Sequence, residues 1–319
     1  MDRCPVARKE WRPVTIIAIA DEVRAALAAG RGVVALESTI LSHGLPSGRN
    51  RKVAERLEAV VREAGAVPAT IAVLDGKIRV GLDERQLDRL CAADSGLVKL
   101  SKRDLGPAIA MNQDGATTVA STAAIAHAAG IGVFGTGGLG GVHLPLPGKH
   151  SSWDVSADLD ALAETPVLVV SSGVKSVLDI EATLELLETR SVPVIGYQTD
   201  HFPGFYLRES AYALSWRVDT PKQAADVVHA HWQVPGQAGI LLANPIPPEY
   251  EMDRELHDQL LADGVKLLDE RGVQGRDVTP VLLEHFHTAS SGVSLDANEA
   301  LVVANVTLAA QIAADLAER

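Results

Sequence analysis

Short apolar runs alternate with helical patterns along most of the chain. Five continuous runs are typical of strands buried on both faces, as in a parallel sheet: residues 32–36, 131–134, 166–170, 193–197 and 239–243. Elsewhere apolar positions recur three or four residues apart, often with a glycine after the last one, which predicts helices. The longer predicted helices cover residues 20–29, 50–64, 117–129, 176–189, 220–232, 253–271, 279–288 and 298–317.

Turn and cap residues add detail to this pattern. Asp75-Gly76 separates the apolar runs 70–74 and 77–80, which predicts a hairpin. Shorter helices are expected over 83–92, capped by Asp83, and over 156–164, capped by Ser156, with a short strand at 98–100. The alternation predicts an α/β fold, a three-layer α/β/α sandwich with a largely parallel central sheet. We expect a single domain over 1–319, with residues 1–19 as an N-terminal extension.

Composition narrows the kind of ligand. The chain has 319 residues, 47% of them hydrophobic but only 4% aromatic, so Ala, Val, Leu and Ile must build the core. Lys and Arg number 29 against 41 Asp and Glu, a net charge of −12. No net positive field attracts a nucleic-acid backbone, so we expect no nucleic-acid partner. A small phosphorylated ligand held by a few local lysines remains compatible with this charge.

Cysteines and targeting signals point to a cytoplasmic protein. Cys4 and Cys91 cannot form a disulfide framework, and neither has the spacing of a metal knuckle, which fits a reducing compartment. The first residues, MDRCPVARKEWRPV, contain no apolar stretch of a signal peptide. No run approaches the roughly eighteen apolar residues of a membrane span, so no membrane partner is expected.

Two side chains at strand ends could perform chemistry. Glu37 directly follows the strand at 32–36, where partial burial would raise its pKa and suit it to proton transfer. Lys175 follows the strand at 166–170 at the predicted start of a helix, beside Val174 and Val177. Apolar neighbours and a helix N-terminus would favour the free amine that Schiff-base chemistry needs. A turn carboxylate and an exposed lysine are the ordinary alternatives, and His43 could be a site residue or loop content.

Other candidates concern anion and metal binding. The glycines of TGGLGG (136–141) could bring amides to a phosphate, but a tight turn explains them equally well. Lys99 and Lys102 could neutralise a phosphate or lie in a solvated turn. Two histidines and two aspartates could bind a metal, with Mg²⁺ or Mn²⁺ favoured over zinc, although Asp158 also suits a helix start: His143, His150, Asp154 and Asp158. Asn298 could bind a uracil-like edge or cap the last helix.

Longer phrases carry a family resemblance. VVALESTILSHGLP, GATTVASTAAIAHAAGIGVFGTGGLGGVH, DVSADL, SSGVKSVLDIEATLELLETRSVPVIGYQTDHFPGFY, ANPIPPEY, TPVLL and SLDAN occur in the order seen in pseudouridine-5′-phosphate glycosidases, which include proteins called indigoidine synthase A. The chain resembles this family from about Ala20 to Ala314. The resemblance implies an α/β/α sandwich, a homotrimer, and reversible cleavage of the C–C glycosidic bond of pseudouridine 5′-phosphate to uracil and ribose 5-phosphate.

The resemblance also implies roles for individual residues. Lys175 matches the lysine that forms a Schiff base with C1′ of the opened ribose, Glu37 the acid/base at the base carbon, and Asp154 the Mn²⁺ ligand. Asn298 matches a uracil contact. The remaining substrate-contacting positions, largely at the ribose phosphate, are Lys99, Val119, Thr136, His143, Ser156, Ala157 and Asp158. Ordinary glycosidase chemistry would fail here because a C–C bond offers no basic leaving atom to protonate. An iminium instead supplies an electron sink.

Departures from the family pattern leave the acceptor open. GGVHLPLPGKHSSWD is longer than usual, with Leu144 in place of arginine, and Ala304 precedes a single Asn305. Arg276 and Val281 replace a common lysine and phenylalanine. We hypothesise that the base differs from uracil. The alternatives are nucleotide salvage with uracil, a C-nucleoside synthase that joins ribose 5-phosphate to another acceptor, and a sugar-phosphate-binding protein without catalysis.

Overall fold

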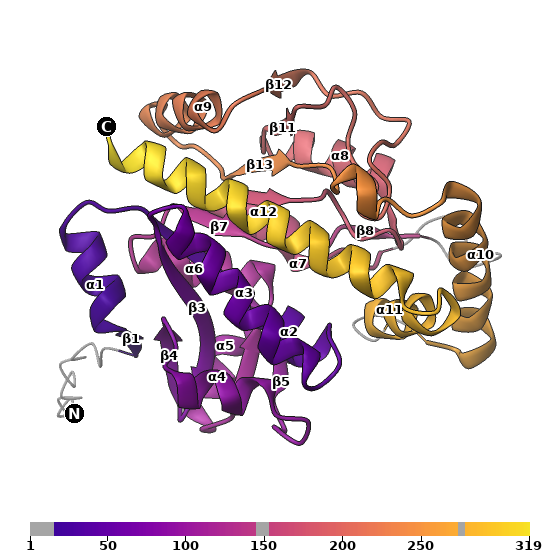
Figure 1. The fold of residues 1–319 in the computed structure, drawn as a ribbon, viewed down its shortest axis with the longest axis horizontal. Helices are drawn as coiled ribbons and strands as arrows, with labels where there is room; N and C mark the ends of the chain where they lie inside the picture. The colour runs from indigo at the N-terminus through magenta and orange to yellow at the C-terminus, as the bar shows by residue number, and fades with distance from the viewer. Residues whose placement is uncertain (1–15, 145–152, 274–277) are drawn as a thin grey trace, which may run out of the picture.

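The central sheet runs through the whole molecule. The computed structural model describes residues 16–144, 153–273 and 278–319, and within them eleven strands form one sheet (Figure 1). Its strands are β1 (Ile17–Ile19), β2 (Val33–Leu36), β3 (Val67–Leu74), β4 (Lys77–Val80), β5 (Val98–Leu100), β6 (Gly115–Thr117), β7 (Val133–Gly135), β9 (Leu168–Ser171), β11 (Val194–Tyr197), β12 (Trp216–Val218) and β13 (Ile240–Ala243).

Most strands run parallel to their neighbours. The main order is β1-β4-β3-β2-β7-β9-β13-β11-β12, and β5 and β6 extend the sheet beside β3. From β3 through β2, β7, β9, β13 and β11 to β12 every pairing is parallel. The β3–β4 and β3–β6 pairs are antiparallel. The carboxyl ends of β2, β7, β9 and β13 therefore meet at one edge, where α/β proteins bind ligands.

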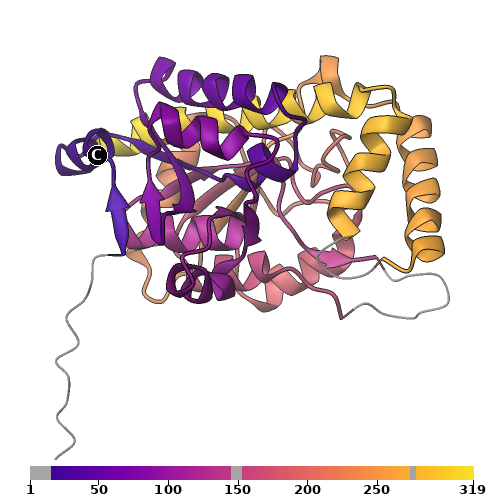
Figure 2. The same ribbon diagram turned by 90° about the horizontal axis from the view of Figure 1, so that it is seen from below.

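Helices cover both faces of this sheet. They are α1 (Asp21–Ala28), α2 (Thr39–His43), α3 (Arg49–Glu63), α4 (Glu84–Cys91), α5 (Leu105–Ala110), α6 (Val119–Ala128), α7 (Ala157–Glu164), α8 (Ile180–Thr189), α9 (Pro221–Gln233), α10 (Arg254–Arg271), α11 (Val278–Ala289) and α12 (Val293–Ala317). In Figure 2, α3 and α12 lie on one face and α6 and α7 on the other, while α10 and α11 stand beside one end of the sheet. The predicted three-layer sandwich is confirmed.

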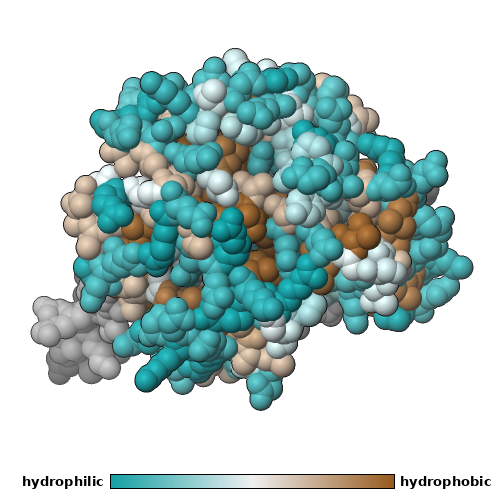
Figure 3. Space-filling view, viewed as in Figure 1, coloured by the Kyte–Doolittle hydropathy of each residue, from teal (hydrophilic) through white to brown (hydrophobic). Residues whose placement is uncertain are grey.

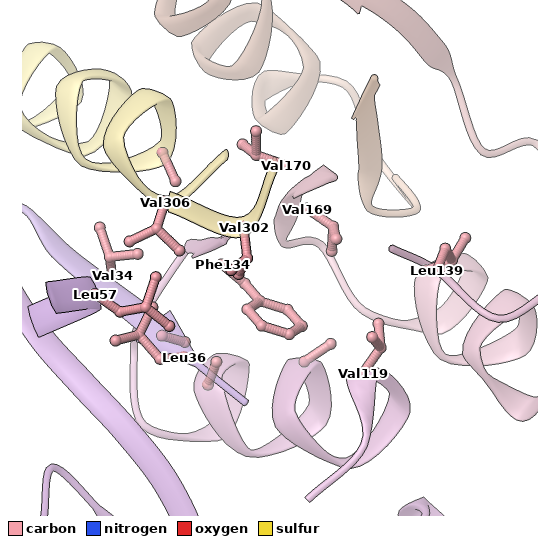
Figure 4. Packing of buried hydrophobic residues seen from close by; sticks show 14 of the residues in the cluster. Val34, Leu36, Leu57, Val119, Phe134, Leu139, Val169, Val170, Val302 and Val306 are labelled. Carbon is pink, nitrogen blue, oxygen red and sulfur yellow. The ribbon is translucent and has the colours of Figure 1, made fainter. Parts of the chain in front are cut away.

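The core is aliphatic, as the composition predicts. Phe134 on β7 is fully buried between the sheet and α6, and Val302 and Val306 of α12 pack on the other side of β7 (Figure 4). Gly135 allows this approach, because a Cβ there would lie 3.0 Å from the backbone of Val306. Close packing of small side chains gives α12 its stable place across the sheet. That place matters because α12 also contributes side chains to the functional site.

Local signals placed several elements correctly. Asp75 and Gly76 both have positive φ, 54° and 65°, and join β3 to β4 with Leu74 opposite Lys77, so the predicted hairpin is confirmed. The cap of α4 is also as predicted: the Asp83 side chain accepts a hydrogen bond from the backbone of Gln86. Residues 17–19, inside the expected N-terminal extension, form β1 and pair with β4.

Three expectations need correction. The helix expected at 176–189 begins at Ile180, because a short strand, β10 (Leu178–Asp179), comes first and pairs with β8 (Val142–His143). The last helix begins at Val293 after Gly292, whose φ is 92°, so Asn298 lies inside the helix and does not cap it. Finally, α12 is long and apolar enough to cross a membrane by length and composition, contrary to the expectation from the apolar runs.

The position of α12 explains this apolar composition. It packs against β7 and β9 and lies between α3 and α9, as a core helix does. Half of its most apolar window is buried. Figure 3 is viewed in the same direction as Figure 1. Hydrophobic residues are exposed across the middle of this face, between largely hydrophilic regions.

Candidate active site

A cavity of about 420 Å³ lies at the carboxyl ends of the parallel strands. Its floor comes from the segments that follow β2, β7 and β9, and α2, α6, α7, α11 and α12 complete the wall. The described residues that line it are Glu37, Thr39, Ile40, His43, Gly44, Lys99, Ser101, Arg103, Thr118, Val119, Gly137, Gly138, Gly140, His143, Asp154, Val155, Ser156, Ala157, Asp158, Lys175, Phe205, Thr279, Pro280, Leu283 and Asn298.

The structure brings almost all predicted site residues together. Every residue to which the family resemblance gives a role lines the cavity except Thr136, which is buried and contacts Glu37. His43 lines the cavity as well. Lys102 does not: its ammonium pairs with Glu164 on α7, so the solvated-turn interpretation holds for this lysine. His150 lies outside the described residues.

Glu37 is held at the end of β2 by a buried hydroxyl cluster. The hydroxyl of the next residue, Ser38, donates to the carbonyl of Ile71 at 2.6 Å and accepts from the amide of Thr117 at 2.8 Å. These bonds tie the end of β2 to β3 and β6. The Oγ1 of Thr136, just after β7, donates directly to the Glu37 carboxylate. Glu37 therefore points into the cavity from a rigid support.

The surroundings of Glu37 suit proton transfer. Burial raises the pKa of the Glu37 carboxyl above its usual range, and this is the largest effect on it. The nearby ammonium of Lys175 and the hydrogen bond from Thr136 act in the opposite direction and lower that pKa. A carboxyl whose pKa is raised keeps its proton to a higher pH than an exposed carboxyl does, which suits a general acid.

Lys175 reaches the same cavity from the end of β9. Its amide donates to the carbonyl of Leu139 at 3.1 Å, which joins its loop to the glycine segment after β7. Val174 and Val177 are buried beside it, as expected. The expected helix N-terminus is wrong, because α8 begins five residues later at Ile180. Of the two features expected around Lys175, only the apolar neighbours are present.

Asp158 fixes the glycine segment to two helices. It is buried at the start of α7, and its two carboxylate oxygens accept from the amides of Ala120, at 2.8 Å, and Gly140, at 2.9 Å. A Cβ at Gly140 would lie 2.3 Å from the Ser156 hydroxyl, so close packing explains this glycine. Ser156 caps α7 as predicted, since its hydroxyl accepts from the amide of Asp158. Asp158 thus holds the glycine segment and the start of α6 in place around the cavity.

We expect Asp158→Ala to destabilise the protein by about 3 kcal/mol, because two buried amides would lose a charged acceptor. Asp160→Ala is the matched control on the same helix: its carboxylate is half exposed and pairs with Arg190, so we expect a loss under about 1 kcal/mol. Urea unfolding followed by circular dichroism measures both. Equal losses in the two variants would contradict this structural role for Asp158.

His143 and Asp154 form a second polar group in the cavity. His143 Nδ1 is buried and, within the described part of the chain, has no hydrogen-bond partner; it lies 4.0 Å from an Asp154 oxygen. Burial lowers the pKa of His143, and the Asp154 carboxylate partly offsets this effect. A neutral imidazole beside a carboxylate is a donor set that divalent cations accept. The described residues contain no group of three or more potential metal ligands.

Several lining residues were not found from the sequence. Phe205 has a φ of 65°, a strained backbone for a bulky residue, and its amide donates to the carbonyl of Ser172 at 3.1 Å. Thr279, Pro280 and Leu283 reach the cavity from α11. Nothing in their local patterns marks them. The family phrases are the one signal that covers them, since Phe205 lies in SSGVKSVLDIEATLELLETRSVPVIGYQTDHFPGFY and the three residues of α11 lie in TPVLL.

The fold and this cavity define an α/β enzyme whose acid and amine side chains meet at the carboxyl edge of a parallel sheet. A family model described as indigoidine synthase A like protein matches residues 22–315. The chain belongs to this family.

Curated relatives match over nearly their whole length. The pseudouridine-5′-phosphate glycosidase of Streptomyces griseus subsp. griseus is 53% identical over 298 residues, 93% of this chain and 91% of that protein. The protein of the same name from Symbiobacterium thermophilum is 50% identical over 302 residues, which cover 94% and 98% of the two chains.

Solved structures share the fold. The prealnumycin C-glycosynthase AlnA, crystallised in complex with ribulose 5-phosphate, is 39% identical with a TM-score of 0.87, covering 96% of this chain and 98% of that one. An indigoidine synthase A-like protein from Thermotoga maritima is 34% identical with a TM-score of 0.85, covering 95% and 97%.

Proposed function

We propose that this protein is a C-glycosidase that reversibly splits pseudouridine 5′-phosphate into uracil and ribose 5-phosphate. The observation that carries the proposal is the meeting of Glu37 and Lys175 in one cavity, close enough for the ammonium to lower the pKa of the carboxyl. An amine and a carboxylic acid are the two groups that iminium chemistry at a C–C glycosidic bond needs. Relatives about 50% identical bear the name of this activity.

The reaction can be followed through these two residues. The Lys175 amine bonds to C1′ as the bond between C1′ and the ring oxygen breaks, and the freed oxygen takes up the proton that the amine loses. When the C–C bond breaks, its electron pair stays with uracil, the uracil carbon gains the proton of Glu37, and the nitrogen lone pair forms a C=N bond to C1′. Water then hydrolyses this iminium, which releases ribose 5-phosphate and restores the amine, while Glu37 regains a proton from solvent. In reverse, Glu37 removes the proton from the uracil carbon that adds to the iminium.

The same cavity contains candidate contacts for the phosphate end of the substrate. Lys99 on β5 lines it together with Val119 and Ala157, the first residues of α6 and α7. Lys99 and two helix N-termini favour a bound anion despite the total charge of −12, although the Ala120 amide at the start of α6 already donates to Asp158. Thr136 would act on the substrate through Glu37, since it does not line the cavity.

A divalent metal, Mn²⁺, belongs to this proposal. Asp154 and His143 would hold it, and the unpartnered buried Nδ1 of His143 fits such an ion. With two protein ligands, its other ligands would be water and substrate oxygens, which hard divalent cations accept. The ion would supply a Lewis acid for oxygens of the sugar phosphate. A homotrimeric assembly is likewise part of the proposal.

Uracil is the base that we propose. Among the described positions that depart from the family pattern, Leu144, Val281 and Ala304 are not cavity-lining residues. Arg276 lies outside the described residues. Asn298, in contrast, is buried and faces the cavity near Gly137 and Ile40. The departures therefore lend no support to a changed base pocket within the described chain. The likeness to AlnA keeps C-glycoside synthesis as the second candidate.

An acceptor panel tests this choice. We expect uracil to give the fastest C–C bond formation when the protein is incubated with Mn²⁺, ribose 5-phosphate and one base or aromatic acceptor at a time, with products followed by mass spectrometry. Asn298 can match both a donor and an acceptor on the uracil edge. Cytosine, which presents a different edge, is the matched control. Faster product formation with a larger aromatic acceptor would favour the synthase instead.

A further inference from the structure

Asn305 joins the carboxyl ends of three neighbouring strands from inside α12. Its side chain is completely buried. The amide nitrogen donates to the carbonyls of Thr136, at 2.9 Å, and Gly137, at 3.2 Å, just after β7. The amide oxygen accepts from Asn244 Nδ2, just after β13, at 3.0 Å, and the Ser172 hydroxyl after β9 lies 3.1 Å from the amide nitrogen.

Packing alone does not explain an amide at this place. The neighbouring positions on α12, Leu301, Val302 and Val306, are buried and apolar. A buried amide is costly unless its donors and acceptor are satisfied, and here satisfaction requires the three strand ends to keep their spacing. The amide thus specifies the relative positions of the segments after β7, β9 and β13, which a leucine of similar size could not do.

The segment after β7 contacts the proposed acid, Glu37, through Thr136. Three groups of Thr136 form hydrogen bonds. Its carbonyl accepts from the Asn305 side-chain amide, its backbone amide donates to the carbonyl of Val170 at 3.0 Å, and its hydroxyl donates to Glu37. We propose that Asn305 is a positioning residue for the reaction: through Thr136 it fixes the carboxyl of Glu37 in the orientation that proton transfer needs. This inference rests on the proposed function, in which Glu37 is the acid/base.

The test separates turnover from sugar binding. We expect Asn305→Asp, which keeps the acceptor but replaces the donor by oxygen, to lower kcat by up to about 100-fold. The KM for pseudouridine 5′-phosphate should stay within about twofold, since the phosphate end is untouched. Leu308→Ala, one turn further along α12 and also buried, is the control for lost stability, and its kcat should match the wild type.

The pH profile gives a readout that a purely structural role would not move. The charged groups that face Glu37 are Lys175, Asp158 and Lys99. Because Asn305→Asp adds a carboxylate that would itself raise the pKa of Glu37, the pH profile is measured in Asn305→Leu, which removes the donor and adds no charge. The hydrogen bond from Thr136 lowers the pKa of Glu37, so its loss should move the alkaline limb of cleavage to higher pH. Thr136→Val should cause the same move, and the two changes together should be less than additive.

The outcomes are distinguishable. If Glu37→Gln is inactive but Asn305→Asp matches Leu308→Ala in kcat and Asn305→Leu matches it in pH profile, the positioning role is refuted and the proposed function stands. Additive shifts of the pH profile in Asn305→Leu and Thr136→Val would also refute it. If the wild type releases no uracil, the proposed function itself fails. Should Asn305→Asp not fold, Asn305→Ser, which keeps a donor, should fold and retain more activity than Thr136→Val; less activity would overturn the proposal.

Discussion

Lys175→Ala should abolish uracil release from pseudouridine 5′-phosphate, with kcat reduced on the order of 10⁴-fold or more. Without the amine no iminium can form at C1′, and no nitrogen lone pair is available to bond to C1′ as the electron pair of the C–C bond leaves with uracil. A continuous assay of uracil release, with pseudouridine 5′-phosphate well above its KM, measures this loss. Sugar-phosphate binding should persist, because the substitution leaves Lys99 and the two helix N-termini unchanged.

Two further variants distinguish a role of Lys175 as a nucleophile from a role of its positive charge. Lys175→Arg keeps the positive charge but loses the nucleophile, so it should be as inactive as Lys175→Ala. Lys102→Ala is the matched control, because Lys102 pairs with Glu164 and does not line the cavity; its turnover should equal that of the wild type. Substantial turnover in Lys175→Arg would show that the residue acts through its charge.

Glu37→Gln should lower kcat by about 10²- to 10⁴-fold and leave KM nearly unchanged. Glutamine keeps the size and can still accept from Thr136, but it cannot supply a proton. Because cleavage requires protonated Glu37, wild-type kcat should fall as the pH rises through the pKa of Glu37, which burial places above its usual range. The residual activity of Glu37→Gln should lack this limb.

Glu58 offers a matched control for this substitution. It also accepts a hydrogen bond from a threonine, Thr70, at 2.8 Å, and burial also raises its pKa, but it does not line the cavity. Glu58→Gln should therefore keep the turnover and the pH profile of the wild type. If Glu37→Gln behaves like Glu58→Gln, the acid/base assignment is wrong.

The sequence predicted the architecture well where one signal dominates locally. Continuous apolar runs located the central parallel strands, and Asp75-Gly76 located the hairpin. It failed for the two-residue strands β8 and β10, because they have too few positions to show a period. Because β10 was missed, α8 was predicted to begin at residue 176, next to Lys175, and not at Ile180. A buried helix such as α12 also shows little polar alternation, so its first turn was missed.

The site could be assembled only through the fold. Glu37, Lys175 and Asn298 are far apart in the sequence and meet because β2, β7 and β9 are neighbours and α12 crosses them. The family resemblance identified these residues, but local patterns gave each an ordinary alternative. The contact of Thr136 with Glu37 and the bonds of Asn305 depend on strand order and register, which no local pattern contains.

The most direct test of the central claim is chemical trapping of the lysine. The protein is incubated with ribose 5-phosphate, reduced with borohydride, digested and sequenced by mass spectrometry. An imine forms with loss of water, and reduction adds two hydrogens, so the modified peptide should carry the sugar phosphate less one oxygen atom. We predict this mass on Lys175 and on no other lysine of the cavity, Lys99 included. A stable adduct on Lys99 with Lys175 unmodified would contradict the mechanism.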